Sequence, residues 1–109
     1  MDWTLQACKD AGGDFDADAK KCFAKIIYSF DVGHTIDRTK KSHPHGKFDI
    51  DFRDLHAENP LAKKWSYGGS SRNIEKAREN ATSIQAVGTK VQIRIVDAKT
   101  GEILEWQGQ

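Results

Sequence analysis

Apolar residues recur at helical spacing between residues 14 and 30. They are separated mostly by three or four positions, as expected for one face of a helix that packs on a core. This face contains Phe15, Ala19, Cys22, Phe23, Ile26, Ile27 and Phe30. The segment begins with the aspartate-rich stretch DFDAD. These residues would lie at the N-terminus of the helix, where the helix dipole favours negative charge. The pattern therefore predicts a helix within residues 14–30.

A shorter helix is expected over residues 2–11. Trp3, Ala7 and Ala11 share one face at helical spacing, and the Gly-Gly pair that follows would end the helix. Two helices joined by so short a turn predict an antiparallel helical hairpin over residues 1–30.

The two cysteines of the chain, Cys8 and Cys22, fall one on each of these helices. Their midpoint lies next to the glycine turn, so the helical hairpin would place them opposite each other. We therefore expect a disulfide, which would contribute roughly 3 kcal/mol through loop closure and would form in an oxidising compartment. The alternative is a pair of buried free thiols, which are common in cytosolic proteins.

Strict alternation of apolar and charged residues begins at residue 47. In the segment KFDIDFR, residues 47–53, the two kinds of side chain point to opposite sides of a half-buried strand. The apolar side holds Phe48, Ile50 and Phe52, and the charged side holds Asp49, Asp51 and Arg53. The charged side is expected to face solvent or to form the floor of a site. Residues 34–38 predict a further short strand.

The remaining segments predict a loop, a helix and a hairpin. Residues 58–71 contain Asn-Pro and Gly-Gly, which indicate a loop with one turn of helix. Residues 72–87 carry apolar residues at helical spacing, with Ser70 or Ser71 as the N-cap. Residues 90–106 form the clearest hairpin, because alternating segments flank the turn sequence DAKTG.

These elements predict an α+β fold, in which an N-terminal helical hairpin is followed by an antiparallel sheet with one further helix packed on it. The chain of 109 residues fits a single domain. We expect residues 1–30 to form the helical hairpin and residues 31–109 to form the β-rich part.

Charge in this chain is abundant but balanced. Charged residues make up 30% of the sequence and the net charge is +1, so the chain lacks the strong overall positive charge of most nucleic-acid-binding domains. Positive charge is local, because residues 38–47 hold four cationic side chains and no acidic one. No apolar run reaches the roughly 18 residues that a membrane span requires, so no membrane association is expected.

All the histidines of the chain lie between residues 34 and 56, namely His34, His43, His45 and His56. Imidazole exchanges protons near neutral pH. Metal-free cleavage of RNA needs a base for the 2′-hydroxyl, an acid for the leaving oxygen and cations for the phosphate. The sequence therefore predicts a ribonuclease site without metal or cofactor, in which His43 or His45 pairs with His34 or His56.

Cationic side chains near the histidines complete this hypothesis. Arg53 and Arg72 join the histidines as catalytic candidates, because guanidinium groups hold phosphate and its developing charge. Arg38, Lys41 and Lys47 are candidates for substrate binding.

The segment WSYGGSSRN adds a second group of candidates. A glycine–serine loop that runs into a helix presents backbone N–H groups to anions, which makes Ser70 and Ser71 candidates for phosphate binding. Arg72 in the first turn would clamp a phosphate, and Trp65 and Tyr67 would stack on bases.

The segment VQIRIVDAKTGEILEW, residues 91–106, resembles the closing hairpin of small bacterial ribonuclease toxins, including tRNA-cleaving colicins and barnase-like toxin domains. The expected order of helices and strands, and the chain length, are similar to those of the C-terminal toxin modules of contact-dependent inhibition and other polymorphic toxins. The resemblance implies an antibacterial ribonuclease that acts on RNA, with tRNA as one option, and that a cognate immunity protein neutralises in the producer.

Such modules are exported as part of a larger bacterial protein and delivered to the cytoplasm of a target cell. The charged first dozen residues form no secretory signal peptide, which agrees with a module that is excised from a longer chain. A monomer is expected.

Two alternatives remain open. The first is an exported, periplasmic protein-binding module that is stapled by its disulfide and has no catalysis. The second is a metal-dependent nuclease or metal carrier, in which His43 and His45 are joined by His34, Asp37 or Asp49. This second alternative lacks a histidine pair at helical spacing and a nearby cysteine.

Overall fold

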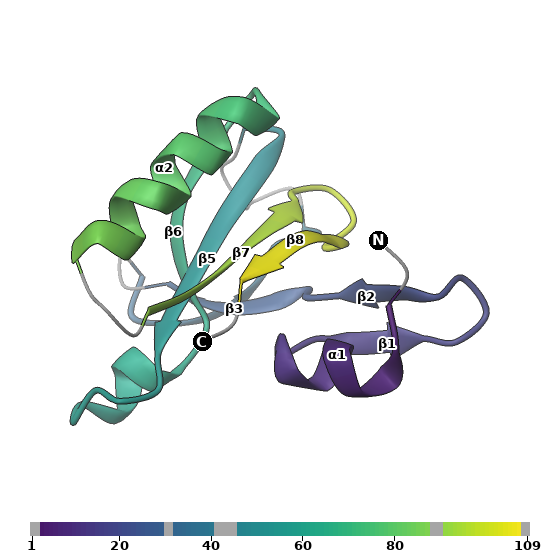
Figure 1. The fold of residues 1–109 in the computed structure, drawn as a ribbon, viewed down its shortest axis with the longest axis horizontal. Helices are drawn as coiled ribbons and strands as arrows, with labels where there is room; N and C mark the ends of the chain where they lie inside the picture. The colour runs from purple at the N-terminus through teal and green to yellow at the C-terminus, as the bar shows by residue number, and fades with distance from the viewer. Residues whose placement is uncertain (1–2, 30–31, 41–45, 88–90, 108–109) are drawn as a thin grey trace.

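The computed structural model describes residues 3–29, 32–40, 46–87 and 91–107. Within these ranges the chain forms two α-helices, one short 3-10 helix and eight strands (Figure 1). In chain order they are α1 (Leu5–Asp10), β1 (Asp14–Asp16), β2 (Lys21–Phe23), β3 (Ile26–Ser29), β4 (His34–Asp37), β5 (Phe48–Asp54), η1 (Pro60–Lys63), β6 (Ser66–Ser71), α2 (Ile74–Val87), β7 (Val91–Asp97) and β8 (Ile103–Gln107).

Most strands belong to one six-stranded sheet with the order β4-β3-β6-β5-β7-β8. Its neighbours are antiparallel except β3 and β6, which pair in parallel where Tyr28 lies opposite Ser66. Strands β1 and β2 form a separate two-stranded ribbon. The sheet is therefore mixed, and the protein is richer in strand than the sequence predicts.

The predicted helical hairpin over residues 1–30 is wrong, because residues 14–29 form β1, β2 and β3 rather than a helix. The side chain of Asp16 explains the difference. Its Oδ1 accepts the backbone N–H groups of Asp18 and Ala19, at 3.0 and 3.1 Å, which builds a turn in place of a helix start. Lys20 then adopts a positive φ of 54°, so the chain reverses and β2 pairs with β1.

Helix α1 lies inside the range 2–11 predicted for it. The Thr4 side chain caps its first turn by accepting the N–H of Ala7. At the other end Gly13 N–H donates to Cys8 O and Gly12 N–H donates to Lys9 O, which is the Schellman arrangement. Gly12 has φ +76° and, in addition, no room for a side chain, since a Cβ there would lie 2.0 Å from an atom of Trp65.

Helix α2 covers one side of the sheet (Figure 1). It lies inside the range 72–87 predicted for it, and its N–H groups are met by Asn73, whose Oδ1 accepts from Glu75, rather than by Ser70 or Ser71. The buried side chains between α2 and the sheet are Ile50, Ala77, Ala81, Ile93 and Ile95. The apolar side of β5 thus faces α2, as the alternation within residues 47–53 predicts.

The predicted loop over residues 58–71 contains η1 and, unexpectedly, strand β6. The Gly-Gly pair that indicated a turn lies inside this strand. A Cβ on Gly68 would lie 2.9 Å from Phe52, and the register of β5 and β6 shifts between Ile50 and Asp51. Gly68 therefore permits a close approach beside a bulge, and the neighbouring Gly69 adopts a φ of +141°.

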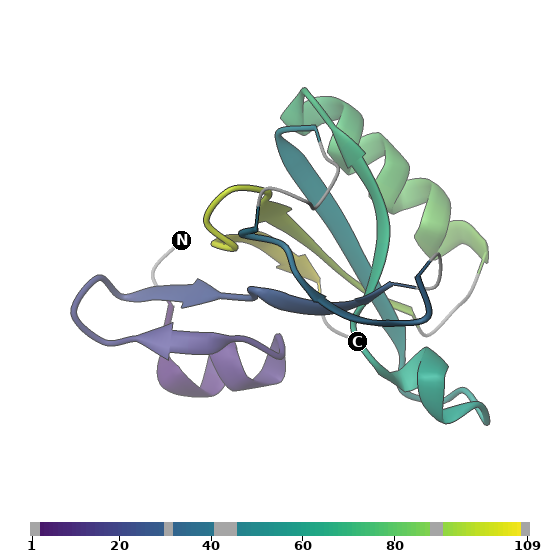
Figure 2. The ribbon, with the colours of Figure 1, turned by 180° about the vertical axis from the view of Figure 1, so that it is seen from behind.

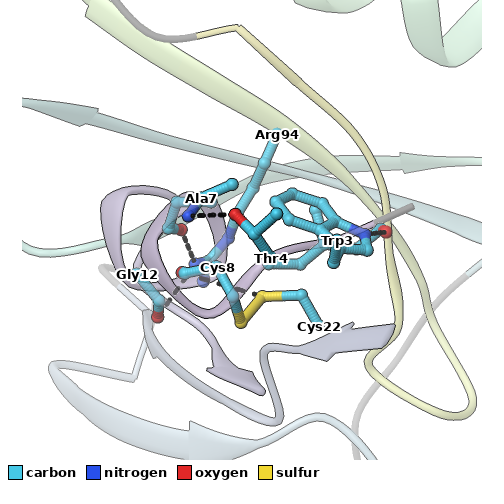
Figure 3. Close-up of a disulfide and its surroundings, with 9 residues drawn as sticks. Trp3, Thr4, Ala7, Cys8, Gly12, Cys22 and Arg94 are labelled. Atoms are coloured by element: carbon cyan, nitrogen blue, oxygen red, sulfur yellow. Dashed lines mark hydrogen bonds between the residues drawn. A yellow bond between two sulfur atoms is a disulfide. The ribbon is translucent and has the colours of Figure 1, made fainter. Parts of the chain in front are cut away.

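The opposite side of the sheet is covered by residues 3–24, which comprise α1, β1, β2 and the residue after β2, and which we call the N-terminal cap. In Figures 1 and 2 the cap and α2 lie at opposite sides of the view. The core between the cap and the sheet contains Trp3, Cys8, Ala11, Cys22, Ala24, Val96 and Ile103. The predicted disulfide is confirmed: Cys8 and Cys22 are bonded, with Cα atoms 5.5 Å apart, so it joins α1 to β2 rather than one helix to another (Figure 3).

Candidate functional site

On the charged side of β5, Asp49 and Asp51 are buried and face neither solvent nor an open site, and Arg53 is partly buried. Asp49 and Asp51 are both 0% exposed, and so is Arg38, while Arg94 is 1% exposed. Arg38 Nη1 lies 3.2 Å from Asp49 Oδ2, and Arg38 Nη2 also donates to Asp51. Arg94 Nε donates to Asp51 at 2.7 Å. We call these four side chains the ionic cluster.

The ionic cluster is assembled from three separate parts of the sequence. Asp51 and Arg94 are directly paired in the register of β5 and β7. Arg38 arrives from the end of β4, where its N–H donates to Lys25 O at 2.8 Å. The predicted role of Arg38 in substrate binding therefore has no support from its position, because its guanidinium is enclosed. Sequence reasoning missed Arg94, although opposite charges at alternating positions of two neighbouring strands were a signal for the pair.

Two arginines extend the ionic cluster towards the cap. Arg94 Nη1 donates to Ala11 O at 2.8 Å and to Gly12 O at 3.3 Å. Arg53 Nε donates to Gln92 Oε1 at 2.7 Å, and its Nη2 donates to Asp10 O at 2.8 Å. The sheet therefore orients both guanidinium groups, and the carbonyl groups at the end of α1 accept their outer N–H groups.

Trp65 lies against both of these guanidinium groups. Its ring centroid is 4.5 Å from Arg53 Cζ and 4.1 Å from Arg94 Cζ, which is within the range of cation–π attraction. Burial lowers the pKa of Arg94 to about 10, and the charge of Asp51 opposes that shift, so Arg94 remains cationic at neutral pH. Trp65 is 9% exposed and does not offer a free face for a base, contrary to its predicted role.

The histidines that the structure describes do not form a site. His34 is exposed at the start of β4, with Nδ1 2.8 Å from Thr35 O, and His56 is exposed in the turn after β5. His43, His45 and Lys41 lie outside the described residues. Among the contacts between described residues, none joins His34 or His56 to each other or to a predicted catalytic arginine.

His56 and Arg72 lie at opposite ends of β5. Ser71, which precedes Arg72, pairs with Phe48 at the start of the strand, whereas His56 follows its end. A strand rises about 3.3 Å per residue, so the seven residues of β5 separate them by roughly 20 Å. The described part of the chain therefore places these predicted catalytic residues apart.

The glycine–serine segment does meet the flank of the histidine-rich segment. Ser70 Oγ accepts the N–H of Gly46, and Lys47 N–H donates to Ser71 O at 2.9 Å. Lys47 and Arg72 are both exposed beside these contacts. Ser70 and Ser71 belong to β6 rather than to a loop that opens a helix, so the predicted anion-binding loop is absent there.

Tyr67, a predicted stacking residue, is half-buried on β6 near the ionic cluster. Burial raises its pKa, and the negative charge of Asp49 raises it further. Its phenol therefore stays neutral well above physiological pH.

A cleft that the sequence did not predict lies between α2 and β8, with a volume of about 530 Å³. Its floor includes Ile93, Ile95 and Leu104, and one face of α2 forms a wall. That wall consists of Arg78, Ala81, Thr82 and Gln85, which recur at helical spacing. The cleft opens beside an edge strand, because β8 has a neighbour in the sheet only on its β7 side.

One ion pair crosses this cleft. Arg78 Nη2 lies 2.6 Å from Glu105 Oε1, and both side chains are partly exposed, at 55% and 37%. The hydrogen bond to Glu105 raises the pKa of Arg78. A helix face and an edge strand become neighbours only through the order of the strands, which explains why no local sequence pattern predicts the cleft.

Within the described ranges, no three histidine, cysteine, aspartate or glutamate side chains are grouped so that they could hold a metal ion. The two described α-helices are both too short and too polar to cross a membrane. Comparison of the chain with protein-family models, with curated proteins and with solved structures finds no match.

Proposed function

We propose that this protein is a disulfide-stapled binding module without catalysis, and that it binds an extended peptide segment of a partner protein along β8. The observation that carries this proposal is the cleft of about 530 Å³ beside the edge of the sheet. Its volume lies within the range of about 300–1,000 Å³ that is common for ligand sites.

The edge of β8 would bind the backbone of a peptide, and the cleft would receive its side chains. An edge strand presents backbone N–H and C=O groups that a further strand satisfies. In this mode of recognition the backbone bonds supply affinity, and pockets for alternate side chains supply specificity. A peptide beside β8 would direct every second side chain towards Ile95 and Leu104.

The accessible part of this edge is limited by the cap. Phe23 forms a bridge with Glu102, and Trp3 Nε1 donates to Ile103 O at 3.3 Å. The available stretch therefore runs from Leu104 to the end of β8, which is long enough to pair with three or so residues of a peptide. The disulfide is compatible with a protein that spends time in an oxidising compartment, such as the periplasm.

Selection from a library of random linear peptides tests this proposal. Thr82 is exposed and lines the cleft, whereas its neighbour Ser83 is exposed and does not line it. We expect peptides selected on the wild-type protein to bind the Thr82→Trp variant at least tenfold more weakly and the Ser83→Trp variant equally well. Failure to select any peptide, or equal binding to both variants, would refute the proposal.

A second candidate is the metal-independent ribonuclease, an antibacterial toxin with an immunity partner. One observation favours it, namely that Gly46 and Lys47, which follow His45 directly, are bonded to Ser70 and Ser71 beside Arg72. His43 and His45 would then act as acid and base, with Arg72 holding the phosphate.

Incubation of the oxidised protein with total RNA in EDTA separates the two candidates. A ribonuclease would cleave RNA and would lose that activity in the His43→Ala/His45→Ala variant and in Arg72→Gln. The binding module would leave RNA intact in every case, and its peptide affinity would be unchanged by the same substitutions.

A further inference from the structure

Arg53 and Arg94 each divide their hydrogen bonds between the sheet and the N-terminal cap. On the sheet side, Arg53 Nε is held by Gln92 and Arg94 Nε is held by Asp51. On the outer side, Arg53 Nη2 and Arg94 Nη1 donate to carbonyl oxygens of the N-terminal cap. If the cap were removed, the sheet would still orient both guanidinium groups, and their outer N–H groups would have no acceptor.

Trp65 adds a third donor at the same place. Its Nε1 is buried and has no hydrogen-bond partner among the described residues, and the ring edge lies against Gly12 of the cap. A buried indole N–H without an acceptor costs the free energy of its desolvation. The cap therefore buries Trp65 Nε1 but supplies no hydrogen-bond acceptor for it among the described residues.

The charges on the sheet side of this point do not balance. Arg38, Arg53 and Arg94 supply three positive charges, and the buried carboxylates of Asp49 and Asp51 supply two negative ones. The charge of Asp10 also acts on Arg53 and opposes the lowering of its pKa by burial, but Asp10 belongs to the cap and would move away with it. Among the described residues, Arg53 has no carboxylate within ion-pair distance and is met by neutral oxygens alone. The carbonyl groups at the end of α1 thus occupy positions where the oxygens of an anion would be better acceptors.

The cap is a candidate for opening as a unit because its apolar contacts are separate from those of α2. Its buried residues pack with Val96 and Ile103 of β7 and β8 in one hydrophobic cluster, and the residues between α2 and the sheet form another. Locally cooperative units of this kind open at less than the global free-energy cost. The disulfide Cys8–Cys22 closes a loop within the cap (Figure 3). Cys8 lies two residues before Asp10, whose carbonyl is the first that accepts from an arginine.

We propose that Cys8–Cys22 is a redox latch, and that its reduction uncovers an oxyanion-binding site formed by Arg53, Arg94 and Trp65. The ligand class is a phosphate group, which the outer N–H groups of the two arginines would bind together with the indole N–H. The guanidinium groups of this site face the cap, whereas α2 forms one wall of the β8 cleft, although Arg94 also lines that cleft. The site does not depend on the proposed function.

Reduction requires a dithiol as the co-reactant. One thiolate of the dithiol attacks a sulfur of the disulfide and forms a mixed disulfide, and the first protein thiol leaves. The second thiolate of the dithiol then displaces the other cysteine. Two electrons and two protons pass to Cys8 and Cys22, and the dithiol becomes a disulfide. Because both cysteines are 0% exposed, attack must follow a brief opening of the cap.

Amide hydrogen exchange tests the latch. After reduction, or in the Cys8→Ser/Cys22→Ser variant, we expect amides of residues 3–24 to exchange at least 100-fold faster, while those of β5, β7 and α2 keep their protection. Loss of protection throughout the chain, or unchanged protection of the cap, would overturn the proposal.

Phosphate binding tests the site. Tryptophan fluorescence is titrated with inorganic phosphate and, separately, with a short single-stranded oligonucleotide. We expect no response from the oxidised protein and saturable binding by the reduced one, at least tenfold weaker in reduced Arg53→Gln and unchanged in reduced Lys76→Gln, which removes an exposed cation of α2. Tighter binding of the oligonucleotide would assign the phosphate to a nucleic-acid backbone, and equal binding would assign it to a small anion. Absence of binding after reduction would overturn the site.

The Gly12→Ala variant provides a test that keeps the disulfide. A Cβ at this position would lie 2.0 Å from Trp65 Nε1 at a φ of +76°, so it should displace the cap from Trp65 while the covalent link limits unfolding. We expect oxidised Gly12→Ala to bind phosphate where the oxidised wild-type protein does not. A folded variant that remains unresponsive would contradict the proposed site.

Discussion

The α2 side of the sheet is held by aliphatic side chains, whereas the cap side combines an apolar cluster with buried charges, although β5 and β7 contribute to both sides. Ile50 and Ile93 point to α2, and Asp51 and Arg94 point to the cap. Aliphatic contacts are tolerant of direction and substitution. Buried charges are tolerated only while every partner is in place, so the two sides should respond differently to the loss of one side chain.

The largest expected effect is on the charged side. Asp51 accepts from both Arg38 and Arg94, so Asp51→Asn would leave two buried guanidinium groups without their shared carboxylate. Breaking a buried pair in this way costs about 3–5 kcal/mol. We expect the free energy of unfolding in urea to fall by that amount. A loss below about 1 kcal/mol, the worth of an exposed ion pair, would show that water reaches the ionic cluster.

The matching change on the aliphatic side is Ile93→Ala. Ile93 is 3% exposed and packs in the core beneath α2. Truncating a buried isoleucine to alanine lowers the free energy of unfolding by about 2–5 kcal/mol. The milder Ile93→Val should lower it by only about 0.5–1.5 kcal/mol. No comparably mild substitution exists for Asp51, and urea unfolding of the three variants would reveal that contrast. Equal losses for Ile93→Val and Asp51→Asn would remove the distinction between the two sides.

A smaller effect is expected within the cap, where Thr4 accepts the N–H of Ala7 at the start of α1. Thr4→Ala should cost about 1 kcal/mol, as is typical for the loss of an N-cap. Asn73 plays the same part for α2, so Asn73→Ala is the counterpart on the other side. Hydrogen exchange should locate the first loss in residues 3–24 and the second in α2. Uniform loss across the chain in both variants would show that the two sides do not open separately.

The aliphatic side could be predicted from the sequence, and the charged side could not. The alternation over residues 47–53 and over 90–106, together with the helical spacing over 72–87, identifies the elements that bury Ile50 and Ile93. Each of these signals is local. The partners of Asp51 are Arg38, which follows β4, and Arg94 on β7, which is adjacent to β5 in the sheet but distant from it in the sequence. Its burial therefore depends on contacts that no local pattern records.

The N-terminal error has a related cause. Residues 14–30 carry apolar positions that fit a helix and also fit three short strands, and the side chain of Asp16 decides between them by forming a turn. The disulfide was nevertheless predicted, because two cysteines on either side of a reversal meet in either arrangement. The structure places His56 and Arg72 at opposite ends of β5, and this separation could not be predicted because it depends on how β5 and β6 pair.

The smallest expected effect tests whether the ionic cluster acts on its surroundings. Burial and the charge of Asp49 raise the pKa of Tyr67 above its ordinary value near 10. A group whose pKa is raised by folding supports the folded state below its unfolded pKa, and that support is lost as the pH rises through the folded pKa. Stability should therefore decline above about pH 10, as Tyr67 becomes costly to ionise.

Tyr67→Phe isolates this contribution from the other groups that titrate at high pH. We expect the variant to lose less free energy of unfolding than the wild-type protein between pH 8 and pH 11, as measured in urea. Tyr28 on β3, whose ring lies beside Lys64, supplies the control for the removal of a tyrosine hydroxyl, and Tyr28→Phe should decline more steeply than Tyr67→Phe. If both variants decline in parallel with the wild-type protein, the buried carboxylates on the cap side are screened from Tyr67, and the charged side of the sheet is less insulated from water than its burial indicates.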